Sequence, residues 1–191
     1  RTQTPLASLE SQRPLLDFEL LAFSLSFETD YLHILDLLAA AHVPLLARER
    51  KAHHPFVIAG GPATFLNPEP VADFFDLFLI GEGEEMIPEF LKRYARVRKA
   101  NLSQADKLQS LGSIDGAYVP TQFSPHYDDD GCLIRLDYTG EGKPSVNRRL
   151  IQDLDAYPTT SQILTPETVF GDMYLIEASR GCEWGCRFCA A

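Results

Sequence analysis

Residues 55–62 read Pro-Phe-Val-Ile-Ala-Gly-Gly-Pro, an apolar run that ends in two glycines and a proline. A short apolar run bounded by turn residues is typical of a strand that is buried on both faces of a sheet. Glycines directly after such a strand let the backbone turn sharply or approach a ligand closely. The stretch therefore predicts a buried strand over 55–59, followed by a tight turn.

The segments around this stretch repeat the order of a strand followed by a helix. Nearly continuous apolar runs predict two further buried strands, over 18–25 and 77–80. Apolar residues at helical spacing and the placement of prolines predict helices over 30–41, 68–75 and 86–97. Thr29 is expected to cap the first of these helices. The alternation predicts an α/β fold, a Rossmann-like doubly wound parallel sheet.

The pattern changes after residue 112, where the strand-like runs become short. The runs 122–127 and 132–138 flank an Asp-Asp-Asp-Gly turn and predict a β-hairpin. Another short run covers 117–119, and 173–178 has the pattern of a buried strand. We predict three parts: an α/β domain over 1–112, a small β-rich linker unit over 113–170, and the start of a further domain over 171–191.

Composition excludes several classes of protein. The 191 residues are 45% hydrophobic and 23% charged, which is typical of a soluble globular protein and excludes disorder and membrane spanning. A net charge of −10 makes nucleic acid an unfavourable partner. The chain starts Arg-Thr-Gln-Thr-Pro without a secretory signal, so we expect a cytoplasmic location and interpret the sequence as an internal segment of a longer protein.

Three of the four cysteines lie within the last ten positions. Cys182, Cys186 and Cys189 form the pattern C-x-x-x-C-x-x-C within Arg-Gly-Cys-Glu-Trp-Gly-Cys-Arg-Phe-Cys. This spacing on a glycine-containing loop lets three thiolates converge on one inorganic centre. Iron–sulfur clusters usually take four cysteines, so three thiolates would leave one iron open for a ligand from outside the protein.

Two other interpretations of these cysteines remain open. A structural zinc site also favours closely spaced thiolates, with Cys132 or a histidine as a fourth ligand, although zinc sites more often use two pairs of ligands. Under that hypothesis the chain is a non-enzymatic α/β binding module. A disulfide between Cys186 and Cys189 is the other alternative, and a cytoplasmic location disfavours it.

The cysteine spacing, on a loop directly after a predicted strand, resembles the signature of the radical S-adenosylmethionine (radical SAM) superfamily. The resemblance implies that Cys182, Cys186 and Cys189 ligate a [4Fe-4S] cluster whose open iron binds S-adenosylmethionine, and that Phe188 lies near the adenine of that cofactor. It also implies an enzyme that cleaves S-adenosylmethionine reductively, with an electron donor such as flavodoxin or ferredoxin. Residues 171–191 would then hold the first strand and the cluster loop of a (β/α) barrel.

The first half of the chain resembles the cobalamin-binding domain that precedes the barrel in one branch of this superfamily. The resemblance rests on three stretches of sequence: 22–26, 57–62 and 79–84. It implies that Ser24, Gly60 and Gly61 line a slot for the nucleotide tail of a corrinoid, which would add methyl transfer to the chemistry. Ser26 stands where these relatives often carry Leu, and the D-x-H-x-x-G sequence that supplies their lower cobalt ligand does not occur in the chain.

The glycine-rich stretches also have a purely structural interpretation. Gly60-Gly61 and the run Gly-Glu-Gly-Glu-Glu at 81–85 suit ordinary strand-to-helix turns, because acidic side chains are favoured at the start of a helix. Two further stretches, 67–70 and 116–120, resemble an uncharacterised radical SAM family. That resemblance implies no particular substrate.

Overall fold

The computed structural model describes residues 6–100, 102–141, 144–167, 169, 171 and 173–187. Phe188 and Cys189 lie outside these residues. The chain divides into two compact units, residues 1–150 and 151–191. The predicted division into 1–112, 113–170 and 171–191 stays a prediction.

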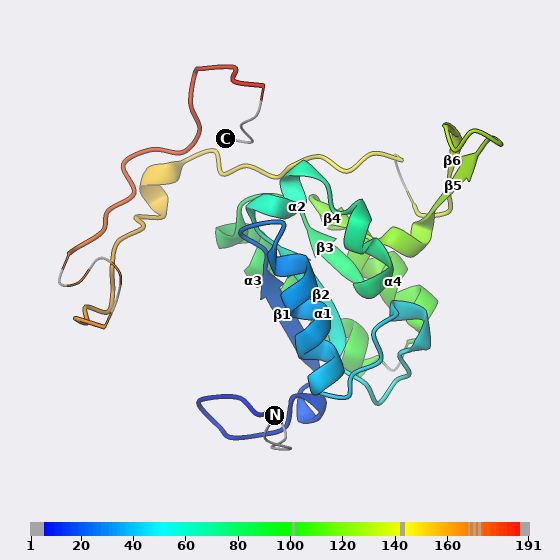
Figure 1. The fold of residues 1–191 in the computed structure, drawn as a ribbon, viewed down its shortest axis with the longest axis horizontal. Helices are drawn as coiled ribbons and strands as arrows, with labels where there is room; N and C mark the ends of the chain where they lie inside the picture. The colour runs from blue at the N-terminus through cyan, green and yellow to red at the C-terminus, as the bar shows by residue number, and fades with distance from the viewer. Residues whose placement is uncertain are drawn as a thin grey trace. The chain divides into compact units, whose positions relative to one another are not determined.

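A four-stranded sheet with the order β1-β2-β3-β4 forms the centre of the first unit (Figure 1). β1 (Leu20–Ser24), β2 (Phe56–Gly60) and β3 (Leu77–Leu79) run parallel, and β4 (Ala117–Tyr118) runs antiparallel to β3. β2 pairs on both sides, and its first four residues are buried. The buried strand predicted from residues 55–59 is confirmed.

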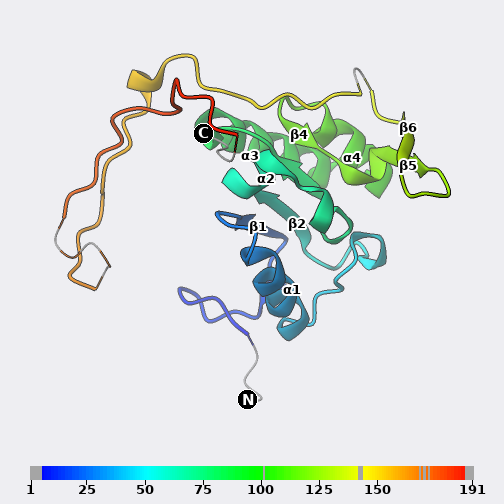
Figure 2. The same cartoon turned by 45° about the horizontal axis from the view of Figure 1, so that its top comes forward.

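Helices cover both faces of this sheet (Figure 2). One face carries α1 (Asp30–Ala40), α2 (Pro62–Leu66) and the 3₁₀-helix η3 (Glu69–Phe74). The other face carries α3 (Gly83–Lys99) and α4 (Gln104–Gly112). Successive residues of β2 pack alternately into these two layers, since side chains of a strand point to opposite faces in turn.

The α/β prediction is confirmed, but the sheet is mixed rather than wholly parallel. The helix α4 was not predicted from the sequence; it follows α3 and packs against it. This additional helix takes the chain to the opposite end of the sheet, so β4 runs antiparallel beside β3. The run 117–119, predicted to belong to the β-rich linker unit, therefore contributes a strand to the main sheet. Within the described residues the strand order runs in one direction, without the reversal that defines a doubly wound sheet.

The strand predicted over 18–25 is shorter and less buried than expected. β1 covers Leu20–Ser24, and within it Ala22 and Ser24 are exposed. The reason is its position, because among the described residues β1 pairs with β2 alone. An edge strand lacks the second neighbour that would bury both of its faces.

The predicted hairpin is confirmed. β5 (Phe123–Tyr127) pairs antiparallel with β6 (Leu133–Tyr138).

No helix in the described part of the chain has both the length and the apolar character needed to cross a membrane.

The second unit contains little regular structure among its described residues. The run 173–178 is not the buried strand that its sequence predicted, since Met173 and Ile176 are 56% and 67% exposed. Ile176 forms a single antiparallel bridge with Thr160. An apolar strand buries its faces only where neighbouring strands and helices cover them, and one bridge does not supply that cover.

Candidate functional site

The structure brings together the three residues predicted to line a corrinoid slot. Ser24 is the last residue of β1 and Gly60 the last of β2, and the two are direct partners in the parallel register. Gly61 follows at once as the residue before α2. The carboxyl edge of adjacent parallel strands is where open α/β sheets commonly bind ligands.

Contacts within the chain account for the conformation of Gly61. Its φ is +99°, and a Cβ added there would lie 2.7 Å from the backbone oxygen of Leu25. That same oxygen accepts a hydrogen bond of 3.0 Å from the amide of Ala63, and the Thr64 hydroxyl donates to the carbonyl of Gly61 at 2.7 Å. The turn therefore needs glycine for its own packing, as the structural interpretation of this stretch predicted.

The turn after β3 is occupied by a distant part of the chain. Gly81 has φ +135°, and a Cβ added at Gly81 would lie 2.2 Å from the backbone oxygen of Arg149. The Arg149 amide donates to the carbonyl of Ile80 at 3.0 Å, and its carbonyl accepts from the amide of Glu82 at 2.8 Å. Gly81 thus permits a close parallel pairing between this turn and the segment around Arg149.

The acidic residues that follow Gly81 hold the Arg149 side chain. Its guanidinium contacts Glu89 at 2.6 Å and Glu85 at 3.4 Å. The hydrogen bond that Arg149 donates to Glu89 is the main cause of the raised pKa of Arg149. The sequence analysis missed this contact, because Arg149 lies 64 residues from Glu85 and no local pattern links them.

Cys182 and Cys186 are exposed and free of disulfide bonds, as the cluster hypothesis requires. The amide of Trp184 donates to the Cys182 sulfur at 3.4 Å, a contact within the loop itself. These thiols have the chemistry that an iron–sulfur cluster needs. The third predicted ligand, Cys189, and the predicted adenine contact, Phe188, lie outside the described residues, and within the described residues no three side chains of His, Cys, Asp or Glu gather as a metal site.

An ion pair lies directly before the cysteine loop. Arg180 donates from Nε to one oxygen of Glu177 at 2.7 Å and from Nη2 to the other at 2.9 Å. These hydrogen bonds are the main cause of the lowered pKa of Glu177. The amide of Glu177 donates to the carbonyl of Thr159 at 3.0 Å, so the residues before Cys182 are tied to an adjacent segment of the same unit.

Cys132, which the zinc hypothesis offers alongside a histidine as a fourth ligand, is exposed in the hairpin turn of the first unit. Its amide donates to the side chain of Asp128 at 2.8 Å. This hydrogen bond fixes the turn and does not involve the thiol.

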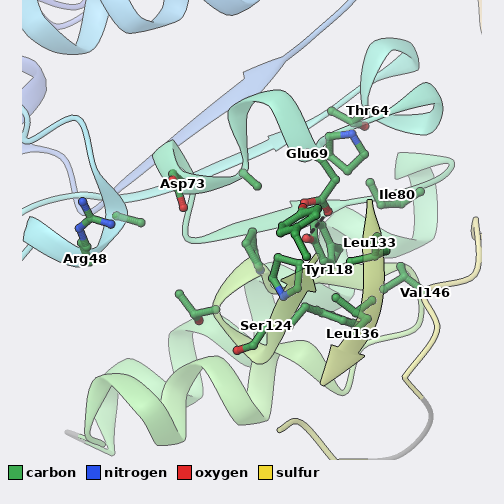
Figure 3. A pocket seen from close by; sticks show the side chains of 18 of the residues that line it. Arg48, Thr64, Glu69, Asp73, Ile80, Tyr118, Ser124, Leu133, Leu136 and Val146 are labelled. Atoms are coloured by element: carbon green, nitrogen blue, oxygen red, sulfur yellow. Dashed lines mark hydrogen bonds between the residues drawn. The ribbon is translucent and has the colours of Figure 1, made fainter. Parts of the chain in front are cut away.

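The first unit also contains a cavity of about 860 Å³ that the sequence analysis did not predict. It lies between α2, η3, the end of β3 and the hairpin β5–β6 (Figure 3). The Tyr118 hydroxyl inside it donates a hydrogen bond to the carboxylate of Glu69. Burial, together with this hydrogen bond, raises the pKa of Tyr118 far above its usual range.

Comparison with known proteins matches a large part of the first unit to a family model. Residues 1–120 match the family model described as the N-terminal part of radical SAM proteins. An uncharacterized protein of Methanocaldococcus jannaschii, MJ0966, is 24% identical over 188 residues, which are 96% of this chain and 32% of that protein. The chain spans about a third of the length of this relative. No solved structure matches the chain.

Proposed function

Because the chain belongs to the radical SAM proteins and contains their N-terminal domain, we propose that it is the front part of an enzyme that cleaves S-adenosylmethionine reductively at a [4Fe-4S] cluster. The observation that carries this proposal is the spacing of Cys182, Cys186 and Cys189 in a chain whose first 120 residues match the family. The cytoplasmic location and the electron donor, a flavodoxin or ferredoxin, are part of the same proposal.

Each predicted residue has a defined role in this proposal. Cys182, Cys186 and Cys189 would ligate three irons, and Phe188 would lie against the adenine of S-adenosylmethionine. When bound, the cluster supplies the electron that breaks a carbon–sulfur bond of the cofactor. The chain's own contribution is positional: the Glu177–Arg180 pair restrains the backbone before the loop, and the contact between the Trp184 amide and the Cys182 sulfur restrains the loop itself.

We also propose that Ser24, Gly60 and Gly61 line a site for a corrinoid. Its support is the position of these residues at the carboxyl edge of two adjacent parallel strands. The sequential parallel order β1-β2-β3, with its connecting helices α1, α2 and η3 on one face, is also what one half of a Rossmann-like doubly wound sheet contains. A corrinoid bound there would add methyl transfer to the chemistry.

Anaerobic reconstitution with iron and sulfide tests the cluster. We expect the chain to take up both elements and to develop a brown, oxygen-labile visible absorption. The variants Cys182→Ala, Cys186→Ala and Cys189→Ala should each lose this uptake. Cys132→Ala is the matched control and should retain it, because Cys132 belongs to the hairpin of the first unit.

The alternative function is a non-enzymatic binding module with a structural zinc site. Stoichiometric zinc that survives anaerobic preparation, together with the failure of iron and sulfide to form a coloured centre, would favour this alternative. Loss of that zinc in Cys132→Ala would identify Cys132 as its fourth ligand.

A further inference from the structure

The cavity of the first unit has the size of a small-molecule site. Its volume of about 860 Å³ falls within the range of roughly 300–1,000 Å³ that is typical of ligand pockets. All of its lining residues belong to the first unit. Ser24, Gly60 and Gly61, the residues of the predicted corrinoid slot, are not among its lining residues.

One wall of the cavity is the apolar face of the hairpin. Pro125 pairs with Leu136 and Tyr127 pairs with Leu133, and these four residues all line the cavity (Figure 3). His126, Arg135 and Asp137 form a charged network on the hairpin and do not line the cavity. Alternation along β5 places Pro125 and Tyr127 on one face, and a register irregularity between His126 and Tyr127 keeps Leu133 as the partner of Tyr127, three residues from Leu136.

These apolar side chains are uncovered in the free protein. Tyr127 is 60% exposed, Leu133 57% and Leu136 47%. Neighbouring large apolar groups that stay exposed beside a concavity mark surfaces where a partner buries them. The ligand should therefore have an apolar body that fits against this wall.

The opposite wall supplies negative charge. Glu69 and Asp73 lie on η3 and line the cavity (Figure 3). Glu69 accepts a hydrogen bond from Tyr118, whose raised pKa keeps its hydroxyl protonated as a donor. Asp73 has no hydrogen-bond or ion-pair partner among the residues that the structure describes.

The charges of the lining residues favour a positively charged ligand. Arg48 is the one cation among the described lining residues, against the two carboxylates. Glu69 and Asp73 are both exposed residues, so a cation that enters the cavity can reach their carboxylates. The net charge of −10 favours cations over anions in the same direction.

From this arrangement we propose that the cavity binds a small organic cation, an amine attached to an aromatic or aliphatic body. The amine contacts Glu69 and Asp73, and the body packs against Tyr127, Leu133 and Leu136. This site requires neither the cluster nor S-adenosylmethionine, so it stands independently of the proposed function.

Titration of the 191-residue chain with tryptamine tests the proposal, with saturation-transfer NMR and calorimetry as the readouts. We expect a Kd of about 1 mM for a fragment of this size. Indole-3-propionate, which has a similar body but a carboxylate in place of the amine, should bind at least about tenfold more weakly.

Two matched variants test whether the carboxylate of Glu69 binds the amine. Glu69→Gln keeps an oxygen for the Tyr118 hydroxyl but removes the charge, and we expect it to weaken tryptamine binding about tenfold. Glu28→Gln removes an exposed carboxylate that does not line the cavity, and binding should not change. A third variant, Leu133→Ser, should also weaken binding through loss of the apolar wall.

Three results would overturn the proposal. The first is that tryptamine, phenethylamine and tyramine all fail to bind. The second is equal weakening by Glu69→Gln and Glu28→Gln, which would show attraction to net charge alone. The third is tighter binding of indole-3-propionate than of tryptamine.

Discussion

At the residue scale, a buried ion pair holds the loop that precedes β2. Arg50 and Asp76 lie 3.1 Å apart, and their side chains are 3% and 4% exposed. Arg50 also donates to three backbone carbonyls, and Asp76 accepts from the amide of Val57. Burial is the main cause of both pKa shifts, since it lowers the pKa of Arg50 and raises that of Asp76. The attraction between the two opposite charges offsets part of the cost of burying each one.

Removing one partner of this pair should cost more than removing an exposed partner. In Asp76→Asn the guanidinium stays buried without a counter-charge, and we expect the free energy of unfolding to fall by about 3–5 kcal/mol. Asp137→Asn breaks an exposed pair with Arg135 and should cost less than about 1 kcal/mol. Urea unfolding measures both, and equal losses would contradict the role given to burial.

Gly61 and Gly131 illustrate two different reasons why a position requires glycine: a positive φ, and close contact with other backbone atoms. Both have positive φ, +99° and +78°, but only Gly61 lies against other backbone atoms. Gly131→Ala should cost about 1–2 kcal/mol from the left-handed conformation alone. Gly61→Ala should cost about 1–3 kcal/mol more, because its Cβ would overlap the backbone of Leu25. Thermal unfolding of the two variants compares them, and a smaller loss for Gly61→Ala would refute the packing argument.

At the scale of elements, two helices begin in different ways. The Ser103 hydroxyl accepts a hydrogen bond of 3.1 Å from the amide of Asp106 at the start of α4. Thr29 precedes α1 but forms no side-chain cap; the carboxylate of Asp30 accepts instead from the amides of Ser26 and Phe27. The cap predicted at Thr29 is therefore wrong, and the Asp30 carboxylate holds the turn that precedes the helix.

This difference predicts that replacement by alanine destabilises the protein more at Ser103 than at Thr29. Ser103→Ala should lower the free energy of unfolding by about 1 kcal/mol, because an amide at the start of α4 loses its acceptor. Thr29→Ala should change it by less than about 0.5 kcal/mol. Urea unfolding of both variants is the measurement, and a larger effect at Thr29 than at Ser103 would contradict the assignment of the caps.

At the scale of the whole molecule, the hydrophobic core belongs to one unit. Both clusters of buried apolar residues, one on each face of the sheet, lie within residues 1–150. In the second unit, by contrast, Leu164, Met173 and Ile176 are more than half exposed. Cooperative stability should therefore reside in the first unit.

Truncation after residue 150 tests whether cooperative stability resides in the first unit. The fragment 1–150 should retain a single cooperative unfolding transition in circular dichroism, because both core clusters remain intact. Limited proteolysis of the full chain should cleave first within 151–187, where most described residues are exposed. A fragment 1–150 without a cooperative transition would show that the second unit is part of the folding core.

Local sequence patterns were sufficient for several elements of the first unit, although α4 was not among them. The apolar run before Gly60, the helical spacing over 30–41 and the turn at 128–131 each appear where they were predicted. Such patterns succeed because residues near one another in sequence determine the periodicity of burial in a helix or strand. The cysteine spacing is equally local, so the candidate ligands could be named from the sequence.

What the sequence by itself determined is thus the α/β class, the order of the main elements and the cysteine motif. Tertiary structure alone decided the antiparallel direction of β4, the pairing of Arg149 with the turn after β3, and the cavity between η3 and the hairpin. These features join segments that are tens of residues apart, such as Glu69 and Tyr118. Their partners are chosen by packing and charge in three dimensions, for which no short-range pattern exists.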